Sequence, residues 1–313
     1  MPSNPYLGAF KPCRSLGRTG FRATVLGIGD LADRSLPLDR CVETVRRAMD
    51  AGLNLIDTAP SYENGYSEEI VGAALKGGRD GMFVIDKIDH LDRPVAEQVE
   101  ASLRRLETDH VGAFVFHGLS KMEDWRRVSA RGGGMEQLDS CVRQGKCRFR
   151  GISSHSPDVL VEAINSGLCD MVLFAVGPYC DQRYIDTVLP LARSKQVAAV
   201  CFKTFGAGKL LCDTAGYSKP LQHRPRGKVS SGGRDGGEQA MLPHLTVQQC
   251  VHYTLSCEVD VALLGMSFPN EQDAGFAAAL SYRKLTTAEI SEIRRQAALA
   301  VKDKGNCWWD PQP

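Results

Sequence analysis

Eight short apolar runs, separated by segments with helical spacing of apolar residues, constrain the fold of this chain more than any other feature. Each run is rich in β-branched residues and short enough for a strand, while each intervening segment has a period near 3.6. The expected strands are ATVLGIG (23–29), LNLIDT (53–58), MFVIDK (82–87), VGAFVFH (111–117), FRGISS (149–154), MVLFAV (171–176), VAAVCFK (197–203) and VALLGM (261–266). Alternation of this kind predicts strand–helix units around a parallel sheet.

Eight such units predict an α/β fold in the form of a closed (β/α)8 TIM barrel, because eight parallel strands close around an interior that side chains can fill. An open doubly wound sheet is the alternative. It requires a glycine fingerprint after an early strand, and Gly27-Ile28-Gly29 lacks the third glycine at the required spacing. We therefore favour one barrel domain over residues 1–313.

Four segments fall outside the strand–helix pattern. CRSLGRTGFRATV is typical of an N-terminal β-hairpin, with its turn at Gly17 to Gly20, which could cover the barrel floor. Residues 119–134 are expected as a loop at the barrel mouth, and residues 212–243, rich in Gly, Pro and Ser, as a long mobile loop after the seventh strand. LTTAEISEIRRQAALAVKDK predicts an extra C-terminal helix, followed by a tail that includes Trp308 and Trp309.

Composition excludes several classes of partner. With 38 basic and 37 acidic residues the formal net charge is +1, so no overall field would gather nucleic acid or an anionic membrane. Apolar runs stay short of the roughly 18 residues that a spanning helix needs, and the first residues do not resemble a signal peptide. The 11 cysteines are scattered, odd in number and form no C-x-x-C pair. We expect a cytoplasmic protein with reduced cysteines and no metal.

Polar side chains stand at the ends of successive expected strands. Asp57 ends the second strand and Tyr62 follows it by five residues; Lys87 ends the third and His117 the fourth. Each has an ordinary structural explanation, such as a helix cap for Asp57, although Lys87 directly after FVID would need a carboxylate partner. Because the C-terminal ends of parallel strands meet at one mouth, their coincidence indicates an active site.

The segment LNLIDTAPSYENGYSEEIVGAAL (53–75) resembles the signature of the aldo-keto reductase superfamily. Further resemblances are RSLGRTG near the N-terminus, SLRRLETDHVGAFVFHG, LDSCVRQGKCRFRGISSHSP and GMSFPNEQDAG, in the family's order. The resemblance implies a (β/α)8 barrel, a nicotinamide cofactor at its mouth, and a catalytic tetrad of Asp57, Tyr62, Lys87 and His117.

Elementary chemistry assigns a role to each member of that tetrad. Hydride addition to a carbonyl carbon leaves an alkoxide, and Tyr62 can supply the proton as general acid if its pKa falls from about 10 towards neutrality. The ammonium of Lys87 would lower that pKa, Asp57 would hold the ammonium, and His117 would donate to the carbonyl oxygen.

The resemblance also implies cofactor contacts. Ser153 and Ser154 match the position of the residues that hold the carboxamide, whereas Leu173 replaces the family's glutamine. The other implied contacts are an aromatic face for the nicotinamide, a glycine-bearing loop for the pyrophosphate and the turn after the last strand for the adenosine end: Phe202; Phe205, Gly206, Gly208 and Leu210; Gly265 and Ser267.

The cofactor is expected to be NADP, as in most of the family, with NAD possible. GMSFPNEQDAGF contains no Arg or Lys for the 2′-phosphate, and Gly275 replaces the family's common asparagine. The expected activity is hydride transfer between this cofactor and a small aldehyde, ketone or sugar, and hence a small-molecule carbonyl substrate. The alternative is a cofactor-binding regulatory or interaction subunit with little turnover.

Overall fold

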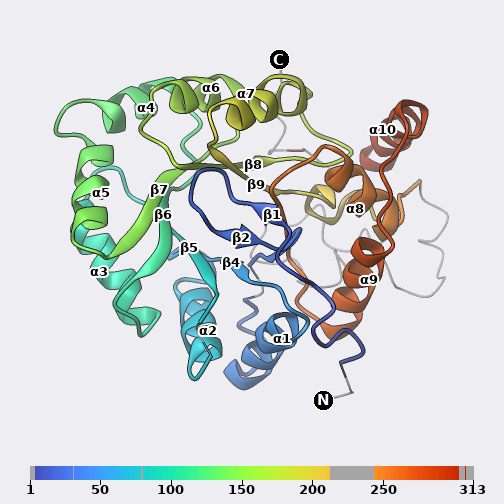
Figure 1. The fold of residues 1–313 in the computed structure, drawn as a ribbon, viewed down its shortest axis with the longest axis horizontal. Coiled ribbons are helices and arrows are strands. Elements are labelled where there is room, and N and C mark those ends of the chain that lie inside the picture. The colour runs from blue at the N-terminus through green and yellow to red at the C-terminus, as the bar shows by residue number, and fades with distance from the viewer. Residues whose placement is uncertain (1–3, 31, 79, 212–242, 303–306, 308–313) are drawn as a thin grey trace.

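A closed barrel of eight parallel strands forms the centre of the molecule (Figure 1). The computed structural model describes residues 4–30, 32–78, 80–211, 243–302 and 307. The barrel strands, each paired with its neighbours in chain order, are β3 (Leu26–Ile28), β4 (Leu55–Asp57), β5 (Phe83–Ile88), β6 (Val111–Phe116), β7 (Cys147–Ser153), β8 (Met171–Ala175), β9 (Ala198–Phe202) and β10 (Val261–Leu264). Pairing of β10 with β3 closes the ring. The predicted (β/α)8 architecture is confirmed.

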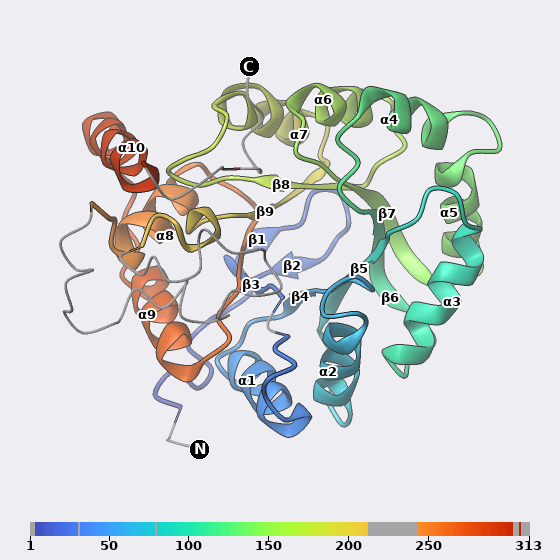
Figure 2. The same cartoon turned by 180° about the vertical axis from the view of Figure 1, so that it is seen from behind.

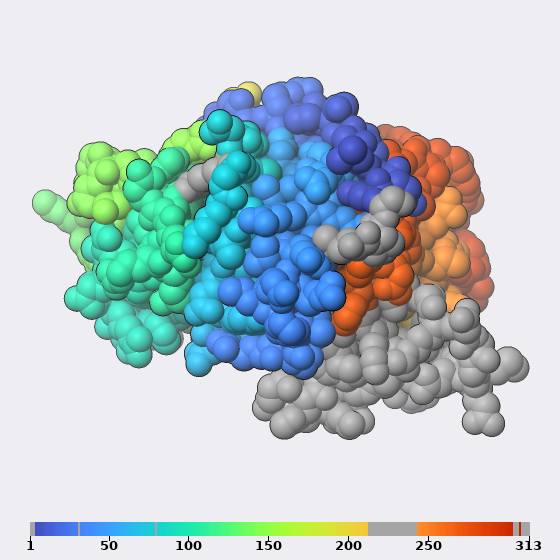
Figure 3. All heavy atoms as spheres, turned by 90° about the horizontal axis from the view of Figure 1, so that it is seen from below, coloured from blue at the N-terminus to red at the C-terminus, as the bar shows by residue number. Residues whose placement is uncertain are grey.

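Helices cover the outside of the barrel, one or two after each strand (Figures 1 and 2). They are α1 (Leu38–Asp50), α2 (Tyr66–Leu75), α3 (Val95–Arg105), α4 (Met122–Ser129), α5 (Gly134–Arg143), α6 (Pro157–Asn165), the π-helix η1 (Tyr184–Val188) with α7 (Leu189–Ser194), α8 (Val247–Ser256), α9 (Pro269–Leu280) and the extra α10 (Thr287–Val301). Neighbouring helices pack side by side, as α1 and α2 do in Figure 3. In the described part of the chain, no helix has the length and apolarity to cross a membrane.

The predicted hairpin covers one opening of the barrel. Strands β1 (Arg14–Ser15) and β2 (Arg22–Ala23) pair antiparallel and lie across the opening that faces the viewer in Figure 1. Leu16 is fully buried among the residues that line the barrel interior. Gly17 has φ +49°, and a Cβ there would lie 2.4 Å from the backbone nitrogen of Ala198. The turn therefore requires glycine to approach the first residue of β9 this closely.

Alternation along the strands decides which side chains enter the barrel. On β5, Phe83 and Ile85 belong to the interior cluster, whereas Val84 and Ile88 pack against the outer helices. Because side chains alternate between faces, Lys87 has the inward parity of Phe83 and Ile85. The same parity places Asp57 inward, two residues after the interior Leu55.

Three predicted boundaries need correction or lie outside the description. The first expected strand, 23–29, is divided, since Ala23 belongs to the hairpin and the barrel strand starts at Leu26. The segment 119–134 is not wholly a loop, because α4 forms within it and buries Trp125 and Val128 against the fold. Residues 212–242 and 308–309 lie outside the described residues, so a mobile loop, an aromatic tail and a single domain over 1–313 stay predictions.

Candidate active site

The four predicted catalytic residues come together at the C-terminal ends of β4, β5 and β6, which are neighbours in the barrel. Asp57 is the last residue of β4, Lys87 lies next to the end of β5, and His117 directly follows β6. Tyr62 stands in the loop after β4. Side chains from three strand ends and one loop thus share the barrel mouth, opposite the hairpin.

Lys87 and Asp57 form a buried ion pair. The Lys87 Nζ lies 2.7 Å from Asp57 Oδ1 and 2.7 Å from the carbonyl oxygen of Thr58. Only 2% of the lysine side chain and 6% of the aspartate side chain are exposed. Burial acts against the ammonium, but the charge of Asp57 and its hydrogen bond outweigh burial and raise the pKa of Lys87. A permanent positive charge is therefore held inside the mouth.

Tyr62 packs between that charge and the imidazole of His117. The Lys87 Nζ lies 4.7 Å from the centroid of the Tyr62 ring, and the tyrosine and histidine ring centroids are 5.5 Å apart in an edge-on arrangement. The expectation that Lys87 brings the pKa of Tyr62 down towards neutrality does not hold in this structure. Burial of the hydroxyl raises the pKa above its ordinary value, and the opposing effect of Lys87 is smaller.

His117 has a carboxylate partner that the sequence analysis missed. Asp89 Oδ1 lies 2.5 Å from His117 Nδ1, and the Ser61 hydroxyl lies 3.4 Å from the same nitrogen. The Ser61 backbone N–H donates to Asp89 Oδ2 at 2.8 Å. One signal could have revealed Asp89: it follows Lys87 by two residues, so it has the same parity at the end of the same strand.

The two serines predicted for the cofactor lie at the end of β7, but their hydroxyls have partners within the chain. Ser153 Oγ accepts the Gly118 N–H at 2.8 Å, and Ser154 Oγ accepts the Ser156 N–H at 3.0 Å. Leu173 pairs in register with Ser153 and lines the barrel interior. An apolar side chain thus stands where the resemblance implied an amide.

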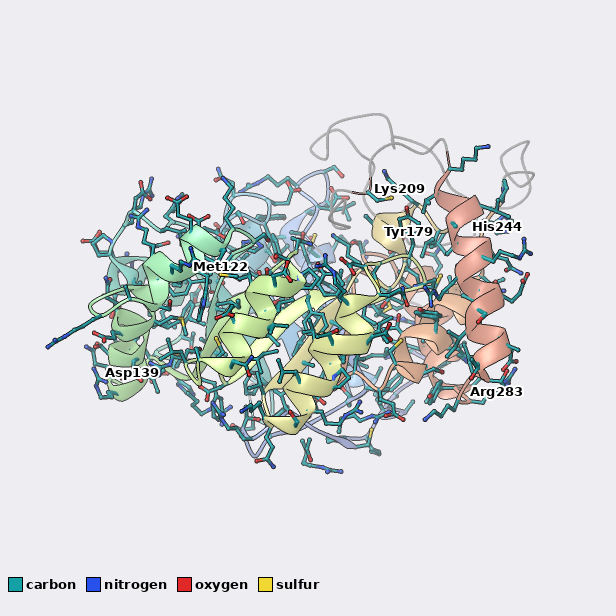
Figure 4. All side chains as sticks on the ribbon, turned by 90° about the horizontal axis from the view of Figure 1, so that it is seen from above. Met122, Asp139, Tyr179, Lys209, His244 and Arg283 are labelled. Carbon is teal, nitrogen blue, oxygen red and sulfur yellow. The ribbon has the colours of Figure 1, made fainter. Side chains whose placement is uncertain are left out.

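Phe202 ends β9 on the inward parity of Ala198 and Val200. Its partly buried ring lies 5.3 Å from the ring of His155, centroid to centroid, at an angle of 55°. Phe202 therefore places an aromatic side chain at the mouth, as the resemblance implied. Tyr179 and Lys209, from the segments after β8 and β9, lie at the same end of the barrel (Figure 4).

The glycine-bearing loop after β9 forms the short 3-10 helix η2 (Gly206–Gly208). The resemblance implied that this loop holds the pyrophosphate of the cofactor. Instead, the N–H groups of Gly206 and Gly208 donate to the carbonyl oxygens of Lys203 and Phe205, both at 2.8 Å, and Leu210 donates weakly to Phe205. A phosphate at these amides would have to compete with the loop's own hydrogen bonds.

The turn after β10 carries Gly265 and Ser267 and leads into α9. Glu271, in the first turn of α9, accepts the backbone N–H of Ser267 at 2.7 Å and that of Phe268 at 3.3 Å through Oε2. It is almost fully buried. A carboxylate therefore already satisfies donors at this helix N-terminus, a feature that the sequence analysis missed although Glu271 follows the helix-starting Pro269 by two residues.

The cysteine thiols are mostly buried, which makes them poor nucleophiles. Of the cysteines that the structure describes, most are buried and all are free thiols. Burial raises the pKa of the Cys147 and Cys169 thiols to about 12 each. Within the described ranges, no group of three or more His, Cys, Asp or Glu side chains could hold a metal ion.

Residues 24–296 match the family model described as Aldo/keto reductase family. This chain belongs to the aldo/keto reductase family. Aldo-keto reductase YhdN of Bacillus subtilis is 28% identical over 217 residues, 63% of this chain and 62% of the relative. NADH-specific methylglyoxal reductase of Escherichia coli is 28% identical over 218 residues, 63% of this chain and 66% of the relative. The aligned regions thus span less than two thirds of each relative's length.

A solved structure of an aldo-keto reductase from Klebsiella pneumoniae in complex with NADPH is 20% identical and has a TM-score of 0.66. The match covers 90% of this chain and 95% of that one. At this identity the likeness concerns the fold.

Proposed function

We propose that this member of the family catalyses hydride transfer between a nicotinamide dinucleotide and a carbonyl or alcohol substrate, with Tyr62 as the general acid and base. The observation that carries the proposal is the buried Lys87–Asp57 pair beside the Tyr62 ring. A buried charge pair is a poor stabilising device, because desolvation offsets most of the attraction. Perturbed titratable groups gathered at one mouth support a catalytic role instead.

The residues across the mouth from this pair fit a nicotinamide. The Ser153 hydroxyl accepts one backbone N–H and keeps its own hydrogen for a carboxamide, the Ser154 hydroxyl would have to give up its weak bond to the Ser156 carbonyl to donate, and Phe202 offers an aromatic face to a planar ring. When bound, the cofactor supplies or accepts the hydride. We propose NADP as the preferred cofactor with NAD possible: the Klebsiella neighbour is a complex with NADPH, whereas the E. coli relative is named NADH-specific. The buried carboxylate of Glu271 would repel the 2′-phosphate of NADP if that phosphate lay nearby. NAD, which lacks this phosphate, therefore remains an alternative cofactor.

Each tetrad residue then has one task in carbonyl reduction. As hydride adds to the carbonyl carbon, the Tyr62 hydroxyl passes its proton to the oxygen and the product alcohol forms. Lys87 stabilises the resulting tyrosinate, Asp57 holds Lys87 in place, and His117 contacts the substrate oxygen. The pKa of Tyr62 is raised by burial, so its hydroxyl carries a proton throughout the neutral range, and the Lys87 ammonium acts against burial, which makes that hydroxyl a stronger acid than the same buried ring would be without the cation.

Substitution of the acid tests the proposal. Tyr62→Phe should lower the rate of NADPH oxidation with a panel of small aldehydes at least a hundredfold, within the roughly 10²- to 10⁴-fold of acid–base groups. Cofactor affinity, measured by fluorescence titration, should change little. Tyr282→Phe is the matched control, because Tyr282 follows α9 and its ring packs against His252, 5.7 Å away centroid to centroid, rather than against the tetrad.

The same assay distinguishes an enzyme from the alternative, a cofactor-binding regulatory or interaction subunit. Tight cofactor binding by the wild-type chain without turnover of any substrate would favour a regulatory or interaction subunit. Near-normal turnover by Tyr62→Phe would remove Tyr62 from the acid role. The expected substrate is a small carbonyl compound, and a cytoplasmic location stays a prediction.

A further inference from the structure

Asp89 lies outside the predicted tetrad yet contacts His117 and the backbone of the residue that precedes Tyr62. It directly follows β5 and only 12% of its side chain is exposed. One carboxylate oxygen meets His117 Nδ1 at 2.5 Å, and the other accepts the backbone N–H of Ser61 at 2.8 Å. Ser61 immediately precedes Tyr62. A single side chain therefore ties the ring of His117 to the loop that carries Tyr62.

Asp89 is ionised in this arrangement. Burial acts to raise its pKa, but the hydrogen bonds with His117 and Ser61 outweigh burial and lower it. An ionised carboxylate has no proton to donate, so the hydrogen in its bond to His117 belongs to Nδ1. In the neutral ring, Nε2 then carries a lone pair and can only accept. Donation from Nε2 requires a second proton on the ring.

The groups around His117 leave this assignment unchanged. Tyr62 lies edge-on to the ring, and Lys87 and Asp57 form their own pair behind Tyr62. The Ser61 hydroxyl is the further contact at Nδ1, at 3.4 Å, and a hydroxyl can turn either way. Among these groups, only Asp89 fixes a proton on one nitrogen.

We propose that Asp89 is a positioning residue for the reaction, which holds His117 with its proton on Nδ1 and makes donation from Nε2 to the substrate oxygen depend on the doubly protonated ring. The inference rests on the proposed function for its kinetic part. A second donor at the substrate oxygen, beside the Tyr62 hydroxyl, stabilises the negative charge that develops there, and a cationic imidazole gives a charge-assisted hydrogen bond, about twice as strong as a neutral one. The rate of reduction by the wild-type chain should therefore fall with rising pH.

Asp89→Asn tests the proposal with little change of shape. The amide can donate its Nδ2 hydrogen to Nδ1 and still accept the Ser61 N–H through its oxygen. The neutral ring would then carry its proton on Nε2 and donate without a second proton. Asp92→Asn is the matched control, since Asp92 is three residues further on, exposed, and outside these contacts.

Nitrogen-15 NMR of the histidine rings reads the tautomer without any substrate. The chain has seven histidines, and His117→Gln identifies the signals of His117 by their loss. At a pH where the ring is neutral, we expect a proton on Nδ1 in the wild-type chain and in Asp92→Asn, and a proton on Nε2 in Asp89→Asn. A proton on Nε2 in the wild-type chain would overturn the proposal even if the Asn variant did not fold.

The kinetic readout is the pH profile of kcat for carbonyl reduction. In acid, Asp89→Asn should be slower by roughly tenfold, less than the 10²- to 10⁴-fold or so of losing the acid itself, with the KM for the cofactor unchanged. Its rate should not decline with rising pH as that of the wild-type chain does. Identical profiles for the two would overturn the positioning role. If no carbonyl substrate is turned over, the proposed function fails and the role in reaction falls with it, while the NMR result decides the tautomer separately.

Discussion

The mouth and the floor of the barrel each contain an ion pair with similar geometry, and they differ in burial. At the mouth, Lys87 and Asp57 lie 2.7 Å apart with almost no exposure. At the floor, Arg18 of the hairpin lies 3.0 Å from Asp170, with 39% and 26% of the two side chains exposed. Distance alone would rank the pairs as equals. Burial separates them, because only the mouth pair loses its hydration and strongly perturbs its neighbours.

The floor pair can be explained by fold alone. Arg18 donates to Asp170 and to the carbonyl oxygen of Cys169, and Asp170 also accepts the backbone N–H of Arg150. These contacts join the hairpin turn to the start of β8. Exposed pairs of this kind contribute little to stability. The mouth pair, in contrast, acts on Tyr62: the charge of Lys87 opposes the rise in the pKa of Tyr62 that burial causes.

The largest expected effect comes from breaking the mouth pair. Lys87→Met leaves the buried carboxylate of Asp57 without its cation, which should lower the free energy of unfolding by about 3–5 kcal/mol in a urea titration. Turnover should fall at least a hundredfold. Loss of the ammonium also removes the effect that opposes burial, so the pKa of Tyr62 should rise further and its tyrosinate should be less stabilised.

A double variant separates the two consequences. Asp57→Asn combined with Lys87→Met removes both charges, and should recover most of the lost stability without recovering turnover. Recovery of turnover in the double variant would contradict the role of the ammonium. If Lys87→Met alone kept the free energy of unfolding of the wild-type chain, breaking the Lys87–Asp57 pair would cost no more stability than breaking the Arg18–Asp170 pair.

An intermediate effect is expected from the loop that positions Tyr62. Glu63 and Asn64 have φ values of +48° and +57°, a left-handed conformation that costs a residue such as Glu63 about 1–2 kcal/mol and that asparagine adopts more readily. Arg34 donates to both of their carbonyl oxygens, at 2.7 and 3.1 Å. Arg34→Ala should lower kcat roughly tenfold, below the roughly 10²-fold that a 1 Å misplacement can cost, with a small change in stability.

A second substitution that relieves the backbone strain at residue 63 checks that prediction. Glu63→Gly in the Arg34→Ala background lets the loop adopt the same φ without the penalty, and should restore part of the lost kcat. A double variant as slow as Arg34→Ala would argue that Arg34 acts on the substrate rather than on the loop. Stopped-flow measurement of kcat at saturating cofactor distinguishes the two.

The strand pattern predicted the fold and the strand-end residues, because both follow from local periodicity. Lys87 and Asp57 were visible as polar residues that end apolar strands of inward parity. Asp89 was not, since an acidic residue after a strand usually caps or turns, and its partner His117 is 28 residues away. The direction of the Tyr62 pKa was also beyond the sequence, because it depends on how much water the folded mouth excludes. The short α4 escaped because only Trp125 and Val128 mark its buried face.

The smallest effect is expected at the floor. Arg18→Ala should lower the free energy of unfolding by less than about 1 kcal/mol, because the lost pair is partly hydrated and Asp170 keeps the Arg150 N–H as a partner. The difference from the wild-type chain should shrink further in 1 M salt, where the Debye length is about 3 Å. Turnover and its pH profile should not change, since the hairpin meets the barrel at the opposite end from Tyr62. A loss of stability comparable to that of Lys87→Met, or any shift in the pH profile, would contradict the conclusion that burial, and not the distance between charges, distinguishes the two ends of the barrel.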